Sequence, residues 1–206
     1  MFIMLDYTGE RVIPELMKPD NGMLLEHCAR YYFASMFTRG RVLDIACGVG
    51  YGCKMLLEYS RHEISEIVGA DVDENTIAYA KKHYLAPKIT FTTADIMDIR
   101  LTEKLQPFDT IVSFETIEHI KDEAFFIRQM RNLLKPGGTL ILSTPFGQGK
   151  NQPSKWPFHY FQLTQEEFKK LFTAFSAAQF YYQCGVIIEP QRGERHYPIG
   201  IAVATK

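Results

Sequence analysis

One stretch decides the fold: VLDIACGVGYG, residues 42–52. Its apolar start predicts a buried β-strand, because a short apolar run that ends at a turn signal is typical of such strands. Three glycines at alternate positions, Gly48, Gly50 and Gly52, then predict a tight turn into a helix over residues 51–60. Because glycine has no Cβ, a ligand can approach the backbone closely there. The free N–H groups at the start of the helix favour a polar or anionic ligand group.

The glycine spacing and a nearby acid separate two classes of cofactor. The dinucleotide fingerprint G-x-G-x-x-G would need a glycine where this chain has Cys53. Asp44, four residues before Gly48, would repel a pyrophosphate but suits a cationic amino-acid ligand. S-adenosylmethionine has that chemistry, since it carries an ammonium, a sulfonium and no phosphate. We therefore predict S-adenosylmethionine as the cofactor, against two alternatives: a nicotinamide-dependent oxidoreductase and a turn that binds no ligand.

The bulk properties are those of one globular domain. The chain has 206 residues, of which 46% are hydrophobic and 23% are charged, and a net charge of −1. This charge argues against electrostatic binding of nucleic acid across the surface. No apolar run is long enough to span a bilayer, so we expect no membrane partner. Four cysteines without a CxxC pair, and no secretion signal, predict reduced thiols and a cytoplasmic location.

Strand and helix patterns alternate along the chain. Strands are predicted at 41–46, 64–72, 89–93, 108–114, 139–144, 177–188 and 199–205. Helices are predicted at 21–38, 51–60, 74–85, 122–135 and 164–173. This order predicts an α/β fold with a doubly wound parallel sheet and an antiparallel final strand. Ligands of such sheets bind at the carboxyl ends of the strands.

Acidic residues lie at or just past the predicted strand ends. Asp71 ends the second strand about 20 residues after the glycine turn, where an acid can bind the two hydroxyls of a ribose. A plain capping or solvated acid is the alternative for Asp71. Asp95 follows the third strand and can accept a hydrogen bond from an exocyclic amine such as that of adenine. Glu115 follows the fourth strand.

With these residues placed, the chain resembles the class I S-adenosylmethionine-dependent methyltransferases over residues 38–206. Five motifs in order carry the resemblance: VLDIACGVGYG (42–52), IVGADVDE (67–74), FTTADIMDI (91–99), FDTIVSFETIEHI (108–120) and LLKPGGTLILSTP (133–145). One departure is Ala46, where the family most often has glycine. Because alanine is small, we expect little harm from it.

The resemblance implies a Rossmann-like sheet of seven strands in the order 3-2-1-4-5-7-6, with the last strand antiparallel. It implies an N-terminal arm and cap helix in residues 1–38, and one methyltransferase domain in residues 39–206. In such a domain Asp44 and the Ala46–Gly50 backbone would hold the methionine moiety, Asp71 the ribose, and Asp95 with Ile96 the adenine. The implied cofactor-binding residues are Asp44, Ala46, Cys47, Gly48, Gly50, Tyr51, Asp71, Val72, Asp95, Ile96, Phe114 and Glu115.

An E-x-x-E-H pattern, Glu115 to His119, follows the fourth strand. On the first turn of a helix, residues three apart share a face, so Glu115, Glu118 and His119 would converge. His159, from a long loop over 146–163, is a candidate fourth ligand. Such a set suits Mg²⁺, Mn²⁺ or Zn²⁺. It looks like the metal site of small-RNA 3′-terminal 2′-O-methyltransferases and ubiquinone-pathway O-methyltransferases, which act on adjacent hydroxyls that a metal can chelate.

Two other roles stay open for these residues. His119 can act as a general base without metal, with Glu118 and His159 as further catalytic candidates. The Glu–His pair can also be structural, as in many metal-free members of the family. The loop that carries His159 is rich in aromatic residues, and we expect it to form a wall of the pocket.

The acceptor is indicated only by the stretch TGERVIPE (8–15), which resembles the N-terminal segment of bacterial methyltransferases associated with sugar and cell-envelope glycan synthesis. Residues 7–11 are either a lid over the pocket or a surface arm. We predict a monomeric or homodimeric enzyme that transfers methyl to a hydroxyl of a small molecule or sugar or glycan intermediate. The alternatives are metal-assisted 2′-O-methylation of an RNA 3′ end, which the charge disfavours, and a non-catalytic S-adenosylmethionine-binding module.

Overall fold

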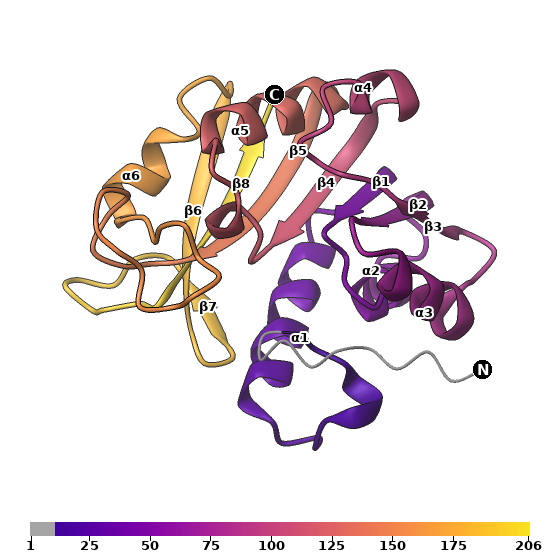
Figure 1. The fold of residues 1–206 in the computed structure, drawn as a ribbon, viewed down its shortest axis with the longest axis horizontal. Coiled ribbons are helices and arrows are strands. Elements are labelled where there is room, and N and C mark those ends of the chain that lie inside the picture. Colours follow the sequence, from indigo (N-terminus) through magenta and orange to yellow (C-terminus); the bar gives the residue numbers. More distant parts are fainter. Residues whose placement is uncertain (1–10) are drawn as a thin grey trace.

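The computed structural model describes residues 11–206, so most of the predicted lid lies outside the described residues. The described chain forms one sheet between two layers of helices (Figure 1). Its strands are β1 (Gly40–Ile45), β2 (Ile64–Asp71), β3 (Ile89–Thr93), β4 (Phe108–Phe114), β5 (Leu134–Pro145), β6 (Ala177–Cys184), β7 (Ile187–Glu189) and β8 (Ile199–Thr205). Its α-helices are α1 (Gly22–Ser35), α2 (Tyr51–Tyr59), α3 (Glu74–Tyr84), α4 (Leu101–Lys104), α5 (Glu123–Leu133) and α6 (Gln165–Lys170). Two 3₁₀ turns are η1 (Pro14–Leu16) and η2 (Ile117–His119).

The strand order is β3-β2-β1-β4-β5-β8-β6-β7. Strands β1 to β5 pair in parallel, and β8 lies antiparallel between β5 and β6. The α/β class, the doubly wound order and the antiparallel β8 agree with the prediction. The predicted number of seven strands is wrong, since the described sheet has eight.

The extra strand comes from a hairpin that sequence reasoning missed. Residues 177–188 were predicted as one strand, but the chain turns back at Gly185 and β7 pairs with the end of β6. Gly185 has a φ of +59°, which a glycine adopts without steric cost and which breaks an extended chain. The turn is two residues long, with Cys184 opposite Ile187, as in tight hairpins.

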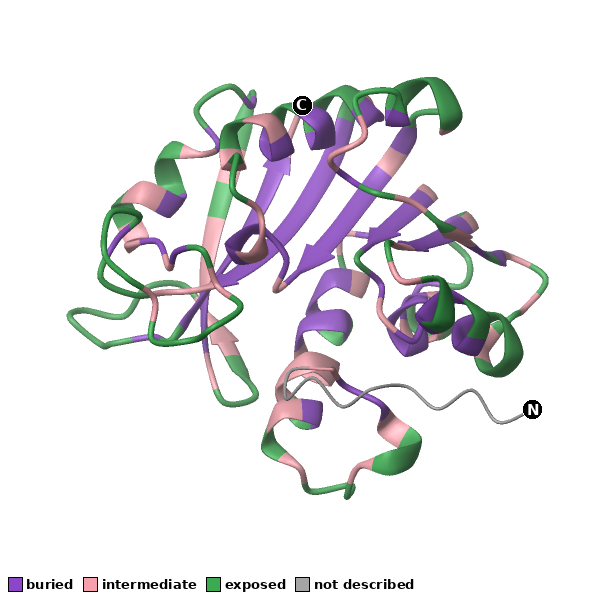
Figure 2. Ribbon diagram, in the orientation of Figure 1, coloured by how far each residue is buried: buried purple, intermediate pink, exposed green. Residues whose placement is uncertain are grey.

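Each face of the sheet has its own core, because alternate residues of the central strands point to opposite sides. Val42 faces the layer that contains α1, α2 and α3, and Leu43 faces the layer that contains α4, α5 and α6. Figure 1 shows these two layers, and Figure 2 shows that the central strands are buried along most of their length. The site is therefore confined to the strand ends and the loops around them.

Side-chain caps fix where several helices begin. Asn21, Asp73 and Asp122 each accept a backbone N–H in the first turn of α1, α3 and α5. Thr164 and Glu167 form the predicted capping box of α6. The four cysteines are free thiols, as predicted. Over residues 11–206, the structure contains no helix with the length and apolarity that a membrane span requires.

Close packing of α1 on α2 leads to the first prediction. A Cβ at Gly52 would lie 2.0 Å from the nearest ring carbon of Tyr31, which cannot retreat because it is buried. Gly52→Ala should therefore lower the free energy of unfolding by about 1–3 kcal/mol, although glycine to alanine in an open helix is normally stabilising. Denaturant unfolding measures the change.

Gly22→Ala is the matched control, because no atom lies within 4 Å of a Cβ at Gly22 in the first turn of α1. That variant should be at least as stable as the wild type. Equal stability of both variants would mean that Tyr31 is not held against α2.

Candidate active site

A cavity of about 620 Å³ lies at the carboxyl ends of the central strands. Its walls come from the turn after β1, from α1, from the segment after β4 and from the loop before α6. The structure brings most of the predicted residues to this one cavity. Those that line it are Ala46, Cys47, Gly48, Tyr51, Phe114, Glu115, Glu118, His119 and His159.

The turn after β1 has the tight geometry that its glycines predict. Gly48 and Gly50 have φ values of +55° and +90°. A Cβ at Gly50 would meet the ring of Phe91 at 2.7 Å, so Gly50 is needed for packing behind the turn as well. Ala46 also has a left-handed φ, +58°. That conformation costs about 1–2 kcal/mol for a residue with a Cβ. The expectation that alanine would be tolerated at position 46 with little effect therefore needs correction, because it considered the size of the side chain and not the backbone conformation.

Asp44 lies behind the cavity wall and does not line the cavity. It is 1% exposed and accepts hydrogen bonds from the Tyr31 hydroxyl at 3.2 Å and the Cys53 thiol at 3.3 Å, both to Oδ2. Burial raises the pKa of the Asp44 carboxyl to about 7. Its predicted contact with the methionine moiety stays a prediction. Asp44 joins α1, β1 and α2 beneath the turn.

The Asp71 carboxylate forms a hydrogen bond to the turn after β1. The Gly48 N–H donates to its Oδ2 at 3.0 Å, and the Asp73 N–H donates to its Oδ1 at 3.0 Å. This carboxylate therefore joins the end of β2 to the turn after β1. Its ribose role stays a prediction.

The predicted adenine-binding residues follow the ends of β2 and β3, and two of the three, Val72 and Asp95, are exposed. Asp95 accepts the Met97 N–H at 2.8 Å, and Ile96 is buried in the core on the α5 side of the sheet. Val72 is 66% exposed. None of these three lines the cavity in the described structure, and their contact with adenine stays a prediction.

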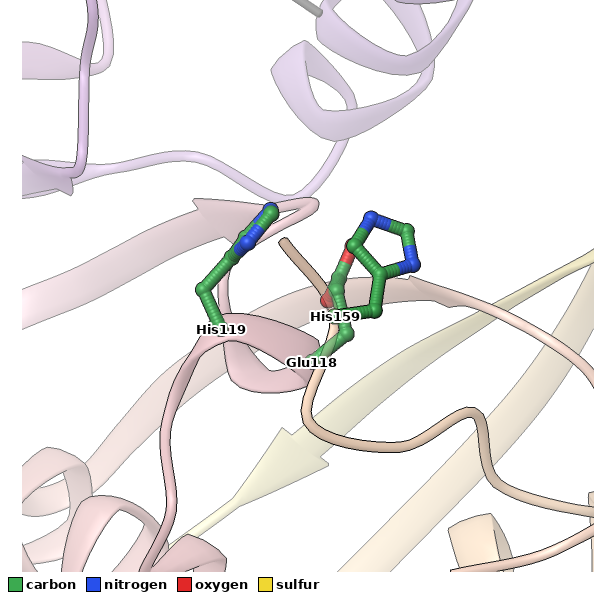
Figure 3. Close-up of side chains that lie close together, drawn as sticks. All are labelled: Glu118, His119 and His159. Carbon is green, nitrogen blue, oxygen red and sulfur yellow. The ribbon is translucent and has the colours of Figure 1, made fainter. Parts of the chain in front are cut away.

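Glu118, His119 and His159 come together on the cavity wall (Figure 3). One potential ligand atom from each lies within 4.8 Å of the others. Glu118 and His119 belong to η2, and His159 belongs to the loop before α6. The two imidazole rings meet edge to face, with centroids 4.8 Å apart. We call these three residues the Glu–His–His cluster.

Glu115 lies outside this cluster, so the predicted set of four ligands needs correction. The segment is a 3₁₀ turn preceded by an irregular stretch, not the first turn of an α-helix. Glu115 itself has a φ of +49°, and the Ser143 hydroxyl donates to its Oε1 at 2.8 Å. The i, i+3 argument fails because it needs helical backbone at both glutamates.

Neighbouring residues fix the orientation of the cluster. Glu118 is 1% exposed, and the Thr144 hydroxyl donates to its Oε2 at 3.0 Å. His119 Nδ1 lies 3.0 Å from the carbonyl oxygen of Phe158. Because a carbonyl can only accept, Nδ1 carries the hydrogen, and Nε2 of the neutral ring has a lone pair. The arrangement can hold a metal ion or accept a proton.

The α1 wall of the cavity includes residues that sequence reasoning did not assign to the site. They are Glu26, His27, Arg30 and Tyr31. The sequence carried a signal for Arg30, because it follows His27 by three residues and so falls in the apolar stripe of the helix. Arg11, from the predicted lid, also lines the cavity and pairs with Asp73 at 2.9 Å.

Comparison with known proteins settles the family. A family model described as "Methyltransferase domain" matches residues 37–195. A probable S-adenosylmethionine-dependent methyltransferase of Mycolicibacterium smegmatis is 32% identical over 172 residues, which are 81% of this chain and 63% of that protein. The chain belongs to the methyltransferase domain family. The prediction of a class I S-adenosylmethionine-dependent methyltransferase is confirmed.

Two further comparisons bear on this methyltransferase domain. A ubiquinone biosynthesis O-methyltransferase of Bradyrhizobium diazoefficiens is 33% identical over 108 residues, 50% of this chain and 39% of that one. The crystal structure of a small RNA methyltransferase aligns with a TM-score of 0.70 at 22% identity, over 95% of this chain and 26% of that one. The latter likeness shows the fold alone. The chain spans less than two thirds of the length of the curated relatives it matches.

The raised pKa of Asp44 leads to a prediction about stability. The carboxyl has a pKa of about 7 in the folded chain and an ordinary value of 3.8, so folding favours its protonated form. The contribution of the Asp44 carboxyl to the free energy of unfolding is therefore greatest below about pH 4. It falls as the pH rises to about 7 and stays low above that pH. Asp44→Asn cannot ionise, so its stability relative to the wild type should increase between these pH values by up to about 4 kcal/mol. Unfolding measured from pH 4 to pH 8 checks this, and parallel pH profiles would contradict it.

The position of Asp71 leads to a prediction about cofactor affinity. Asp71→Ala should weaken binding of S-adenosylhomocysteine by about 1–3 kcal/mol, because hydrogen bonds to a charged carboxylate are lost. Asp98→Ala is the control, since Asp98 pairs with Lys104 on the surface and does not line the cavity. Calorimetric titration of both variants with S-adenosylhomocysteine measures the two affinities. Unchanged affinity in Asp71→Ala would remove Asp71 from the ribose role.

Proposed function

We propose that the chain transfers the methyl group of S-adenosylmethionine to a hydroxyl oxygen of a small molecule or a sugar or glycan intermediate. The Glu–His–His cluster carries this proposal, because it offers proton-accepting or metal-binding groups on the wall of the cavity that Gly48 also lines. Methyl transfer to oxygen needs such groups, since a neutral hydroxyl is a weak nucleophile.

The reaction is a direct displacement at the methyl carbon. A lone pair of the acceptor oxygen forms the new C–O bond, the C–S bond breaks, and its electron pair stays on sulfur to give S-adenosylhomocysteine. The hydroxyl proton leaves to a base. The enzyme aligns the two reactants in line, keeps water out and removes that proton.

The cluster fits a divalent metal ion. Metal–ligand bonds of about 2.0–2.2 Å place opposite ligands up to about 4.4 Å apart, so small rotations close a spread of up to 4.8 Å. Glu118 would offer one carboxylate oxygen, His119 its Nε2, and His159 a ring nitrogen. The hydrogen bonds of Glu118 to Thr144 and of His119 to the Phe158 carbonyl would fix the orientation of these two ligands. A bound metal would lower the pKa of a coordinated hydroxyl, and adjacent hydroxyls suit it as a chelate.

The same residues also support a mechanism without metal. The Nε2 lone pair of His119 can then take the hydroxyl proton directly. The Phe158 carbonyl oxygen, which accepts from Nδ1–H at 3.0 Å, would favour the resulting imidazolium. Glu118 adds a buried carboxyl group to the same cluster. Both mechanisms place the acceptor hydroxyl next to the cluster.

Several observations support the acceptor class. One relative, which matches half of this chain, is named as a ubiquinone biosynthesis O-methyltransferase, so that protein methylates oxygen. A net charge of −1 gives the chain no general attraction for RNA, and the likeness to the small RNA methyltransferase is one of fold. We therefore propose a small acceptor in preference to the 2′-hydroxyl of an RNA.

The test combines calorimetry with S-adenosylhomocysteine, before and after EDTA, with elemental analysis of the purified protein. We expect S-adenosylhomocysteine to bind in both conditions, and one divalent metal ion per chain to be present before EDTA. Glu118→Gln should lose the metal, because it removes the only carboxylate of the cluster. Glu115→Gln is the matched control and should keep it, since Glu115 bonds to Ser143 instead.

Other outcomes separate the alternatives. Cofactor binding without metal, with slow turnover in His119→Ala, would favour the metal-free base. Cofactor binding without release of S-adenosylhomocysteine in the presence of vicinal diols would indicate a non-catalytic module. No cofactor binding at all would overturn the proposed function.

A further inference from the structure

The single tryptophan of the chain lies on the wall of the cavity, and the methyl transfer described above does not use it. Trp156 belongs to the loop between β5 and α6, lines the cavity and is 56% exposed. An indole ring offers a large flat apolar surface, and covering it contributes strongly to binding. Walls of ligand cavities are commonly built from such aromatic side chains. Trp156 therefore offers the cavity a surface that a ligand can cover.

Hydrogen bonds hold this loop against the segment that carries the Glu–His–His cluster. The Tyr160 N–H donates to the Glu118 carbonyl oxygen at 2.8 Å. The Phe158 carbonyl oxygen accepts from His119 Nδ1 at 3.0 Å. The part of the loop that follows Trp156 is therefore fixed relative to the cluster.

A tight turn connects Trp156 to the cluster itself. The His159 N–H donates to the Trp156 carbonyl oxygen at 3.2 Å, and the Trp156 N–H donates to the Ser154 hydroxyl oxygen at 3.0 Å. The ring centroids of Trp156 and His159 are 6.4 Å apart, with 41° between the ring planes. This spacing is typical of neighbouring aromatic rings. Trp156 is thus the direct neighbour of His159, which Figure 3 shows as part of the cluster.

Apolar residues also border the cluster on the side of β5. Thr144, which donates to Glu118, is followed by Pro145 and Phe146, and both of these line the cavity. The Phe146 N–H donates to the carbonyl oxygen of Pro198, which lines the cavity as well. The cavity around the cluster therefore suits a ligand that has a polar group at the cluster and an apolar surface beside it.

The short distance between Trp156 and His159 limits the shape of that ligand. A group that covers the indole and a hydroxyl that reaches the cluster are separated by about the width of one ring, since the two ring centroids are 6.4 Å apart. A hydroxyl attached directly to a flat ring has this shape, and two flat rings attract each other when stacked. A hydroxyl on a flexible open chain lacks the flat surface and loses more conformational freedom on binding.

We propose that Trp156 binds the ring of the methyl acceptor by stacking, so that a hydroxyl attached directly to that ring lies at the Glu–His–His cluster. The acceptor is then a hydroxylated ring with a flat apolar face, which both a phenol and a pyranose sugar provide. This assignment rests on the proposed function, and it narrows the acceptor by excluding open-chain alcohols.

The test uses three neutral probes that all carry adjacent hydroxyls. The hydroxyls are on an aromatic ring in 3,4-dihydroxybenzamide, on a sugar ring in methyl β-D-glucopyranoside and on an open chain in 1,2-propanediol. Each probe is titrated calorimetrically into wild-type protein saturated with S-adenosylhomocysteine. We expect at least one ring probe to bind about tenfold more tightly than 1,2-propanediol, because stacking adds to the buried apolar area. The ring probe that binds more tightly identifies the acceptor as a phenol or a sugar.

Tryptophan fluorescence shows where the ring probe binds. Because Trp156 is the only tryptophan of the chain, emission excited outside the absorption of tyrosine comes from this position alone. We expect the bound ring probe to change the emission of Trp156, with saturation at the concentration that calorimetry gives. Saturation distinguishes this change from collisional quenching. We expect 1,2-propanediol to leave the emission unchanged.

Variants of the loop test the role of the indole ring. Trp156→Ala should weaken binding of the ring probe about tenfold and leave the affinity for S-adenosylhomocysteine unchanged. Trp156→Phe keeps a flat ring and should retain most of the affinity for the probe. Tyr160→Ala is the matched control, because Tyr160 is 55% exposed on the same loop and does not line the cavity. That variant keeps its backbone N–H and should change neither affinity.

Two results would overturn the assignment. The first is a wild type that binds neither ring probe more tightly than 1,2-propanediol, a result that needs no variant. The second is loss of S-adenosylhomocysteine affinity in Trp156→Ala, which would show that the indole contacts the cofactor. Failure of the proposed function looks different, because the wild type would then fail to bind S-adenosylhomocysteine before any probe is added.

Discussion

A hydrogen bond of 3.0 Å between the Gly48 N–H and Asp71 joins the turn after β1 to the end of β2. Much of the cavity depends on this contact, because the turn forms one of its walls and has left-handed backbone at Gly48 and Gly50. Asp44 supports the same turn from below through Tyr31 and Cys53. Two carboxylates that the sequence suggested as cofactor ligands therefore also hold the backbone that would contact the cofactor.

The two halves of the cavity are built differently. The glycine turn is local, because a strand, three glycines and a helix lie within one short stretch, and Asp71 bonds to it from the end of β2. The other half is assembled from α1, η2, the loop that carries His159 and strands β6 and β8. Its shape depends on contacts between segments far apart in sequence.

This difference explains how much could be predicted. The strand and helix order and the glycine turn follow from periodicity and from residues with special backbone preferences, and the structure agrees with them. The hairpin at Gly185 was missed because both its strands read as one extended run. Glu115 was placed in the cluster because helical backbone was assumed where the chain has a 3₁₀ turn. Arg30 was missed because its partner Gln183 is 153 residues away and only the fold brings them together.

The bond between Tyr31 and Asp44 has a consequence for how the cavity can deform. Tyr31 belongs to α1 and Asp44 to β1, and both side chains are buried. The helix wall of the cavity and the strand that leads into the glycine turn are therefore joined by one buried hydroxyl. We expect the two walls to keep their spacing, because moving one away from the other would leave a buried carboxyl and a buried hydroxyl without this partner.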